Sequence, residues 1–374
     1  MPKNTFCPVP WNHYSVNSRG DLRVCCIGAN KPFSYLYKDG IQLNAERDLV
    51  PRNHELYKEL RIAMLSGIEH PYCEQCWDRE RNKLESNRDT YKDHFYPDVM
   101  EQAIKLTKKD GSIDVKDFPI SYYDLRLGNK CNCKCITCND INSSMWDNGK
   151  VTDWSGGNFE TPYMKELISN LEYIDRIYLT GGETTIIESH WKLLDLLIEK
   201  GYNSSVALEY NTNGVVLTKK MLDIWGKFKS VGIGFSIDGM GEVFEKIRYP
   251  AKWSTIVKNL KLFEDHAHPN TYSSFAMTVS SINILNVLDF FKWHMSLNFK
   301  KIHQYPHFNV LYRPENINIR NIDKEQKLII AKKYDEFYIW LKDNVPEYDY
   351  EKYKGNFAGV INSMMENTNE IIET

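Results

Sequence analysis

The sequence predicts an α/β fold, a partial (β/α)6 TIM-like barrel preceded by a small N-terminal module rich in cysteine. Two observations predict it. From residue 118 onward, extended apolar runs alternate six times with amphipathic runs, as strands joined by crossover helices do. All nine cysteines, in contrast, precede residue 139. Six units are fewer than the eight of a complete barrel, so we expect an open one.

The six expected strands are short apolar segments, most of which end in a turn residue. In chain order they are YYDLRLG, RIYLTGG, VALEYNTNG, VGIGFSIDG, SSFAMTVS and HFNVLY. Runs with helical spacing, such as YMKELISNLEYI and HWKLLDLLIEKGY, separate them. After residue 320, DKEQKLIIAKKYDEFYIWLKDN predicts a terminal helix, and we expect an acidic, peripheral tail after it.

The first hundred residues are different, with many turn residues and no strand–helix repeat. YKELRIAMLSG, ended by Gly67, is the one convincing helix there. We divide the chain into a cysteine-rich module (1–104), a polar linker (105–117), the partial barrel (118–315), and a C-terminal helix with its tail (316–374). A module this small needs a bound metal to compensate for its small core.

Composition argues against membrane and nucleic-acid-binding proteins. The net charge of −3 gives no basic footprint for nucleic acid, so we do not expect nucleic acid as a partner. Apolar runs such as LLDLLIE are too short for a membrane span, and MPKNTFCPVPW lacks the core of a signal peptide. We expect a cytoplasmic protein without membrane contact.

The cysteines predict metal sites rather than disulfides. Their number is odd, and Cys25 and Cys26 are adjacent. Without a secretion signal, these features argue against a disulfide framework. Inert core thiols would be scattered along the chain more evenly. We therefore expect most of the thiols to bind metal.

The densest cysteine segment is GNKCNCKCITCN, where Cys131, Cys135 and Cys138 form a C-x3-C-x2-C series after the first strand. Three thiolates on one loop suit three corners of a cubane iron–sulfur cluster and leave one iron without a protein ligand. A structural zinc site needs four ligands, which Cys133 would complete. Alternating positions point thiolates in divergent directions, so we expect Cys133 in a small apolar slot instead.

The segment LRLGNKCNCKCITCN resembles the cluster loop of the radical S-adenosylmethionine (radical SAM) enzymes, although Thr137 stands where many members have an aromatic residue. The resemblance implies that Cys131, Cys135 and Cys138 hold a 4Fe–4S cluster whose open iron chelates SAM. It also implies an electron donor of the flavodoxin or ferredoxin type. Reductive cleavage of SAM then gives a 5′-deoxyadenosyl radical, which abstracts hydrogen from a substrate.

A second motif, YLTGGET, follows the second expected strand. It resembles the family's GGE motif, which implies that Gly181, Gly182 and Glu183 bind the amino group of SAM. Glycines let the backbone approach a ligand closely, and a carboxylate accepts hydrogen bonds from an ammonium group. Thr184 replaces the proline that often follows the motif in the family.

The segments EYNTNG and GFSIDG end the third and fourth strands in the same manner. Both resemble family segments that line the SAM pocket. This implies cofactor-binding roles for Asn213, Ser236 and Asp238, and pairing of Arg248 in EKIRYP with the SAM carboxylate. Their common position at strand C-terminal ends, where barrel active sites assemble, supports these roles.

The N-terminal cysteines follow the pattern C-x12-G-x4-C, a gap, then C-x2-C, formed by Cys7, Gly20, Cys25, Cys73 and Cys76. The pattern resembles Twitch, the shorter relative of the SPASM auxiliary module. The resemblance implies that the four cysteines hold a second 4Fe–4S cluster and that Gly20 forms a hairpin turn. In the family this module usually follows the barrel, whereas here it precedes it.

Two alternatives stay open for this second site. Cys26 could replace Cys25 as the ligand, because the two are neighbours. Zinc could replace the cluster, because C-x2-C pairs are also typical of zinc sites.

The predicted function is an oxidative modification of a substrate. A cluster with four cysteine ligands has no open iron, so we expect it to carry electrons away from a substrate radical. A peptide is the first expected substrate, and dehydrogenation of a small molecule (sugar, aminocyclitol or nucleotide) is the second. A non-catalytic scaffold that binds zinc or iron–sulfur clusters is the remaining alternative. The sequence names no catalytic acid or base, because the radical itself performs the abstraction.

Overall fold

The computed structural model describes residues 5–28, 35–305 and 307–366. Its main sheet has eight strands in the order β10-β9-β8-β7-β6-β5-β1-β2, all parallel except β2. The strands are β1 (His13–Val16), β2 (Leu22–Arg23), β5 (Tyr122–Leu125), β6 (Arg176–Leu179), β7 (Ala207–Thr212), β8 (Ser230–Ser236), β9 (Thr271–Val279) and β10 (His307–Val310). All six expected strands are present in the expected order, and the predicted fold class is confirmed.

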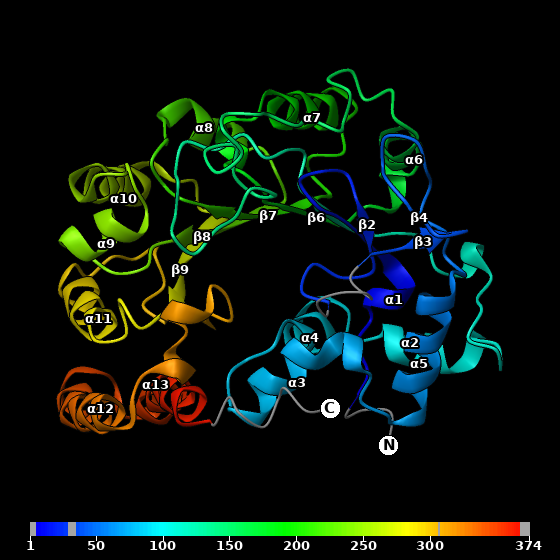
Figure 1. Cartoon of the computed structure of the whole chain (residues 1–374). Coiled ribbons are helices and arrows are strands. Elements are labelled where there is room, and N and C mark those ends of the chain that lie inside the picture. Colours follow the sequence, from blue (N-terminus) through cyan, green and yellow to red (C-terminus); the bar gives the residue numbers. More distant parts are fainter. Residues whose placement is uncertain (1–4, 29–34, 306, 367–374) are drawn as a thin grey trace.

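Helices cover the convex face of the curved sheet (Figure 1). They are α6 (Pro162–Ser169), α7 (Glu188–Glu199), α8 (Lys219–Trp225), α9 (Gly241–Ile247), α10 (Trp253–His266) and α11 (Asn286–Ser296). Local sequence explains their starts. Thr161 caps α6 through Met164 N, with Pro162 in the first turn, and Thr218 caps α8.

The N-terminal region contributes directly to the main sheet. Strand β1 pairs in parallel with β5, so the sheet continues into the segment for which the sequence predicted no strand. HYSV alternates polar and apolar residues but is only four residues long, too short to be recognised as a strand, and all four residues are buried. Gly20, with φ of 86°, lies in the turn between β1 and β2, as the hairpin interpretation requires.

The remaining N-terminal elements gather near the β2 end of the sheet, and α3 and α4 extend across its concave side (Figure 1). They are α1 (Val9–Asn12), the small hairpin β3 (Tyr37–Lys38) and β4 (Ile41–Gln42), α2 (Glu55–Ser66), η2 (Pro71–Cys73), α3 (Glu74–Arg81), α4 (Asn87–Asp89), the π-helical η3 (Thr90–Phe95) and α5 (Val99–Leu106). Helix α2 is the helix expected from YKELRIAMLSG. It ends at Gly67, whose φ is 75°.

Residues 74–96, which we name the crossing segment, span the open side of the barrel. At one end Arg79 Nη1 donates to Asn309 Oδ1 of β10 over 3.1 Å. At the other end the Tyr96 hydroxyl donates to Asp175 Oδ1, just before β6, over 2.7 Å. The segment therefore connects the two sides of the partial barrel.

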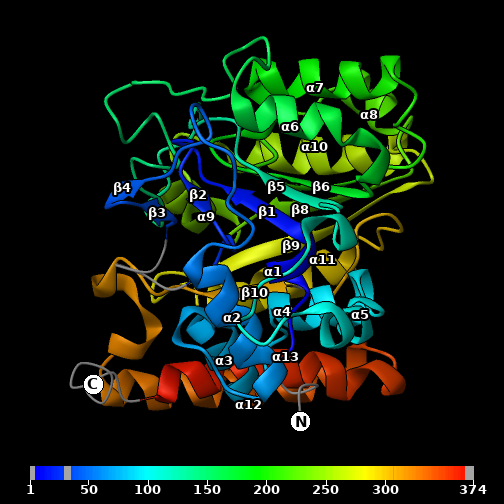
Figure 2. The same ribbon diagram turned by 90° about the vertical axis from the view of Figure 1, so that its right-hand side faces the viewer.

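The C-terminal part differs from its prediction. Helix α12 (Lys324–Asn344) is the expected terminal helix, but residues expected in an acidic tail form a second long helix, α13 (Glu347–Met365). The two helices lie side by side (Figure 2), and α13 also contacts β10. Phe357 and Met364 of α13 are fully buried. The acid-rich start of α13 concealed its apolar positions. Of the helices in the described part of the chain, none has the length and apolarity to cross a bilayer.

Candidate active site

The cysteine loop follows β5 and lies at the C-terminal ends of the parallel strands. Its backbone is held to the segment after α9, because Lys134 N donates to Tyr249 O (2.6 Å) and Ile136 N donates to Ile247 O (2.9 Å). Cys131 N donates to Ser144 Oγ over 3.2 Å. The loop is therefore fixed on both sides of its cysteines.

The three expected cluster ligands are close enough to influence one another's ionisation. Burial, and then the charge of Cys135, raises the pKa of Cys138 to about 12. Burial raises the pKa of Cys131 to about 11. A hydrogen bond from Cys133, and then the nearby Arg248 guanidinium, lowers the pKa of Cys135. Buried thiolates that lie close together repel one another, so they need a nearby positive charge. Iron bound to all three sulfurs would supply that charge.

Cys133 is buried, as expected, but its slot is partly polar. Its sulfur accepts from Asn213 Nδ2 at 3.5 Å, and its carbonyl accepts from Ser143 Oγ at 2.8 Å. Asn213 also donates to Asn132 Oδ1 over 2.7 Å. The predicted SAM-site residue Asn213 thus joins the end of β7 to the cysteine loop.

The two glycines of the GGE motif allow the turn after β6 to pack closely against the cysteine loop. Both have positive φ, 81° at Gly181 and 49° at Gly182. A Cβ on Gly182 would lie 2.3 Å from Lys130 O, and one on Gly181 would lie 2.6 Å from Arg126 Cβ. Glu183 N donates to Lys130 O over 2.8 Å. Larger residues would separate the turn from the loop.

The Glu183 carboxylate is almost completely buried and is held by its neighbours. Oε1 accepts from Thr185 Oγ1 and Thr212 Oγ1, each at 2.7 Å, and Oε2 accepts from Asn213 N at 2.7 Å. Beside it, Thr184 Oγ1 is buried without a partner among the described residues. A fixed carboxylate next to an unsatisfied hydroxyl suits a polar ligand such as the ammonium group of SAM.

Two further residues predicted to bind SAM, Arg248 and Asp238, form an ion pair in the structure. Arg248 Nη2 lies 2.8 Å from Asp238 Oδ2, and Asp238 Oδ1 accepts from Thr278 N at 2.7 Å. Arg248 Nη1 also donates to Cys135 Sγ over 3.8 Å. The sequence paired Arg248 with the SAM carboxylate, whereas here its guanidinium is paired with Asp238 and contacts Cys135, an expected cluster ligand. Ser236, the last residue of β8, is half-buried at the same strand edge.

The N-terminal cysteines line one cavity beneath the sheet, and its wall is otherwise mainly apolar. Its cysteines are Cys7, Cys25, Cys73 and Cys76. Cys26 lines a different cavity, inside the barrel. Burial, and then Cys73, raises the pKa of Cys7, and burial, and then Cys76, raises that of Cys73 to about 12.

Among the described residues, no three His, Cys, Asp and Glu side chains are placed to hold one metal ion between them.

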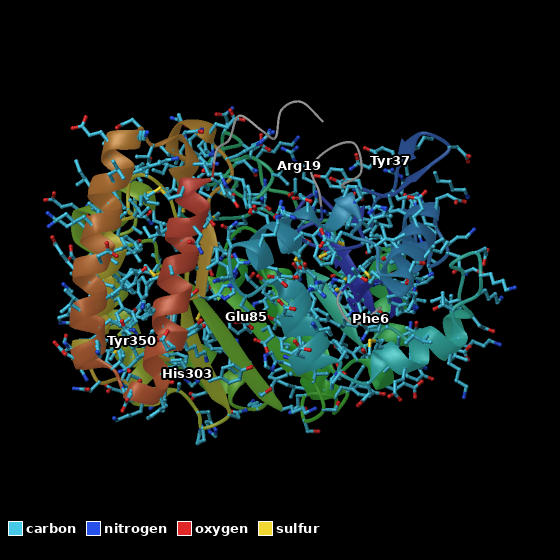
Figure 3. All side chains as sticks on the ribbon, turned by 90° about the horizontal axis from the view of Figure 1, so that it is seen from below. Phe6, Arg19, Tyr37, Glu85, His303 and Tyr350 are labelled. Carbon is cyan, nitrogen blue, oxygen red and sulfur yellow. The ribbon has the colours of Figure 1, made fainter. Side chains whose placement is uncertain are left out.

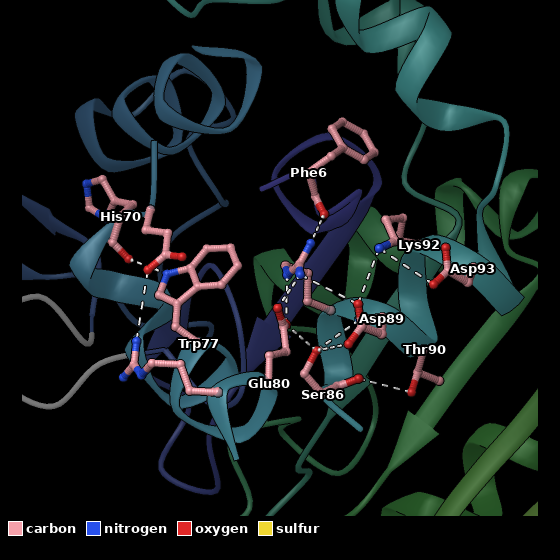
Figure 4. A network of polar contacts seen from close by, with 12 residues as sticks. Phe6, His70, Trp77, Glu80, Ser86, Asp89, Thr90, Lys92 and Asp93 are labelled. Atoms are coloured by element: carbon pink, nitrogen blue, oxygen red, sulfur yellow. Dashed lines mark hydrogen bonds and ion pairs between the residues drawn. The ribbon is translucent and has the colours of Figure 1, made fainter. Parts of the chain in front are cut away.

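Arg88 is the cation that lines the four-cysteine cavity. Figure 4 shows its contacts: Nε donates to Glu80 Oε1 over 2.9 Å, and Nη1 donates to Phe6 O over 3.1 Å. The guanidinium lies over the Trp77 ring, 4.6 Å from its centroid. A four-thiolate cluster is anionic, so a buried cation at its wall offsets part of the cost of burying its charge.

The barrel cavity has a volume of about 500 Å³ and lies between strands β5–β10 and the crossing segment. Sequence reasoning did not find it, because strand spacing does not show which interior positions are left empty. Ile27, Asn87 and Tyr91 line both this cavity and the four-cysteine cavity. One layer of side chains therefore separates the two.

Several solved structures are similar to this chain at low identity. One is anSMEcpe with bound AdoMet, which is 20% identical over 63% of this chain and 60% of that one, with a TM-score of 0.42. Another is Streptococcus suis SuiB bound to S-adenosylmethionine, which is 12% identical over 69% of this chain and 61% of that one, with a TM-score of 0.42. A third is the radical S-adenosylmethionine methyltransferase TsrM from Kitasatospora setae, which is 11% identical over 51% of this chain and 36% of that one, with a TM-score of 0.37. The chain thus spans about three fifths of the length of the first two.

No curated protein matches the chain. Residues 125–293 match the Radical SAM superfamily. The matched region begins at the end of β5 and includes the cysteine loop, the GGE turn, Asp238 and Arg248. The match to this family therefore covers residues 125–293, a little less than half of the chain.

Proposed function

We propose that this chain is a radical SAM enzyme that oxidises a substrate held in the barrel cavity. In this proposal Cys131, Cys135 and Cys138 hold the SAM-cleaving cluster, and a second cluster accepts an electron from the substrate. The observation that carries the oxidative assignment is the shared wall between the four-cysteine cavity and the barrel cavity. An electron acceptor beside the substrate would serve an oxidation, whereas an isomerisation needs no net acceptor.

The chain's own residues would bind and orient the cofactors. Glu183 would accept hydrogen bonds from the ammonium group of SAM, because Thr185, Thr212 and Asn213 hold its carboxylate in place. Arg248 would donate to the sulfur of Cys135, and Asp238 orients Arg248. When bound and reduced by an external donor of the flavodoxin or ferredoxin type, the cluster and SAM supply the 5′-deoxyadenosyl radical.

Cys7, Cys25, Cys73 and Cys76 would hold the second cluster in this proposal. The substrate would lose a hydrogen atom to the 5′-deoxyadenosyl radical, then one electron to this cluster and one proton to water, a net two-electron oxidation. Arg88 at the cavity wall would offset part of the negative charge of any four-thiolate site, whether it holds zinc or an iron–sulfur cluster, so the metal assay decides between the two.

Metal analysis of the anaerobically reconstituted protein tests the proposal. We expect about eight irons and eight sulfides per chain, corresponding to two cubane clusters. A Cys135→Ala variant should lose about half of the iron and all SAM cleavage. A Cys133→Ala variant is the matched control, because it removes a buried thiol of the same loop and should keep both clusters. Zinc with no iron would contradict the enzyme assignment.

A double Cys73→Ala, Cys76→Ala variant separates the two parts of the proposal. We expect it to cleave SAM but not to complete substrate oxidation. About four irons together with bound zinc in the unaltered protein would instead leave the radical domain intact and make the N-terminal site structural.

A further inference from the structure

The barrel cavity is closed on the side where a partial barrel is open. The crossing segment is tied there to β10 through Arg79 and Asn309, and to the start of β6 through Tyr96 and Asp175. Viewed from below, Glu85 of this segment lies between the C-terminal helices and the N-terminal region (Figure 3). An extended peptide across this side would displace those contacts. A compact ligand would not, and about 500 Å³ is the usual size of a small-molecule site.

Two polar side chains of β7 lie across the inner face of β8, where glycines make room for them. A Cβ on Gly232 would lie 2.1 Å from Glu209 Oε2, and a Cβ on Gly234 would lie 2.5 Å from Asn211 Oδ1. All four residues line the cavity. Any larger residue at either position of β8 would displace these oxygens, so the sequence specifically accommodates a polar floor.

The Glu209 carboxylate is oriented by two donors. Its Oε1 accepts from Arg176 Nη1 and from the Tyr272 hydroxyl, the latter at 2.9 Å. Its Oε2 is the oxygen that lies over Gly232, on the cavity floor. One oxygen is thus occupied by protein donors, while the other is placed to accept a hydrogen bond from a ligand.

Charged groups on the inner wall are compensated by neighbours. Glu209 is paired with Arg176, and Arg126 Nε lies 3.7 Å from Asp124 Oδ1. Burial lowers the pKa of His307 to about 4, so this side chain is neutral at pH 7. The charge of Arg126 is already offset by Asp124, so a phosphate would lose its hydration for little net electrostatic attraction.

Aromatic side chains of β5, β6 and the crossing segment form another part of the cavity lining. Tyr91, Tyr122 and Tyr178 line the cavity together with Phe95, and the Tyr122 hydroxyl donates to that of Tyr91 over 3.4 Å. Rings of this kind offer apolar faces to a ligand while their hydroxyls remain available for hydrogen bonding. The cavity therefore combines a polar floor with an amphipathic wall, to which Glu85 of the crossing segment adds a carboxylate.

We infer that the barrel cavity binds an uncharged, hydroxyl-bearing ring, a sugar or cyclitol without phosphate. Its hydroxyls would donate to Glu209 Oε2 and bond Asn211, and its C–H face would lie against the tyrosine wall. The inference rests on the proposed function, in which this ring is the oxidised substrate. It replaces the peptide expected from the sequence with a small molecule.

Calorimetric titration of the reconstituted protein with SAM tests this inference. The probes are myo-inositol, glucose, N-acetylglucosamine, uridine, uridine monophosphate and a neutral hexapeptide. We expect at least one of the three ring polyols to bind at millimolar concentration or below and to raise 5′-deoxyadenosine formation above the rate without substrate. Glu209→Gln should weaken that binding by about tenfold or more, since a hydrogen bond to a charged acceptor is lost.

A cavity-filling variant provides the structural control. Ala276 of β9 lines the cavity, and Ala276→Leu adds volume where the barrel is empty. Ala331→Leu makes the same change on α12, outside the cavity. We expect polyol binding to fall at least tenfold in Ala276→Leu and to be unchanged in Ala331→Leu, which should also retain SAM cleavage in the absence of substrate.

The possible outcomes separate the two proposals. No polyol binding, or preferential binding of uridine, the nucleotide or the peptide, would overturn the inference while SAM cleavage upheld the proposed function. Polyol binding that Ala276→Leu leaves unchanged would also overturn it, because the site would lie elsewhere. Failure of the unaltered, fully loaded protein to cleave SAM would instead contradict the proposed function, whatever binds in the cavity.

Discussion

Replacing Gly182 with alanine should damage the active site far more than its small size suggests. The new Cβ would lie 2.3 Å from Lys130 O and 2.8 Å from the carbonyl carbon of Asn129, so the turn and the cysteine loop would have to separate. An ordinary contact needs about 3.4 Å, so the required shift is about 1 Å. The left-handed backbone adds a cost of about 1–2 kcal/mol, and overpacking of this kind adds about 1–3 kcal/mol.

Gly201→Ala is the matched control for this variant. Gly201 also has a positive φ, 76°, but a Cβ there would meet no atom within 4 Å. Both variants therefore carry the backbone cost, and only Gly182→Ala carries the clash. Chemical denaturation should show Gly182→Ala less stable than Gly201→Ala by about 1–3 kcal/mol. Iron at the cysteine loop and SAM cleavage should fall in Gly182→Ala alone. Equal iron content and equal SAM cleavage in the two variants would refute the argument that the glycine is required for close approach.

Three further predictions follow from single sites. Cys25→Ala should lose about four of the eight irons expected of two clusters, whereas the neighbouring Cys26→Ala should lose none. The reverse result in the iron assay would make Cys26 the ligand. Arg248→Ala should lower the free energy of unfolding by about 3–5 kcal/mol, because it leaves buried Asp238 unpaired. Equilibrium denaturation measures this, and an effect below 1 kcal/mol would contradict it. Burial lowers the pKa of His190 to about 3, so the unfolded chain binds a proton there as the pH falls below about 6.5. Stability should therefore decline from pH 7 to pH 5, by roughly 2 kcal/mol for this residue, and His190→Gln should reduce the decline by that share.

The barrel was predictable because its strands and helices alternate with clear periodicities. YYDLRLG and the five later segments are each apolar, bounded by turn residues and separated by amphipathic helices. Strand β1 was not predictable on these grounds, since HYSV is short and buried on both faces. Helix α13 was concealed for another reason. Its first turns are acidic and aromatic, and only tertiary packing against β10 shows that Phe357 lies in the core.

Some of the site residues could likewise be predicted from the sequence, and others could not. Cys131, Cys135 and Cys138 could be grouped by spacing alone, because they lie on one loop. That Cys25 faces the other three N-terminal cysteines while Cys26 faces the barrel depends on the path of the chain after β2. Glu209 carried no signal in the sequence. Its role depends on Gly232 of the adjacent strand, and strand register cannot be read from local sequence.

The position of β1 brings the N-terminal segment to the end of the sheet where the cysteine loop lies. Since β1 runs parallel to β5, the chain leaves it at the edge where the cysteine loop begins. The turn after β1 contacts this region directly, because Ser18 O accepts from Thr152 Oγ1 at 2.9 Å and Arg19 pairs with Asp140 at 2.8 Å. Strand β2 then returns along β1, so the Cys25–Cys26 pair that follows it reaches the wall between the two cavities. The N-terminal segment therefore lies close to the cysteine loop in the fold, although it precedes the barrel in the chain.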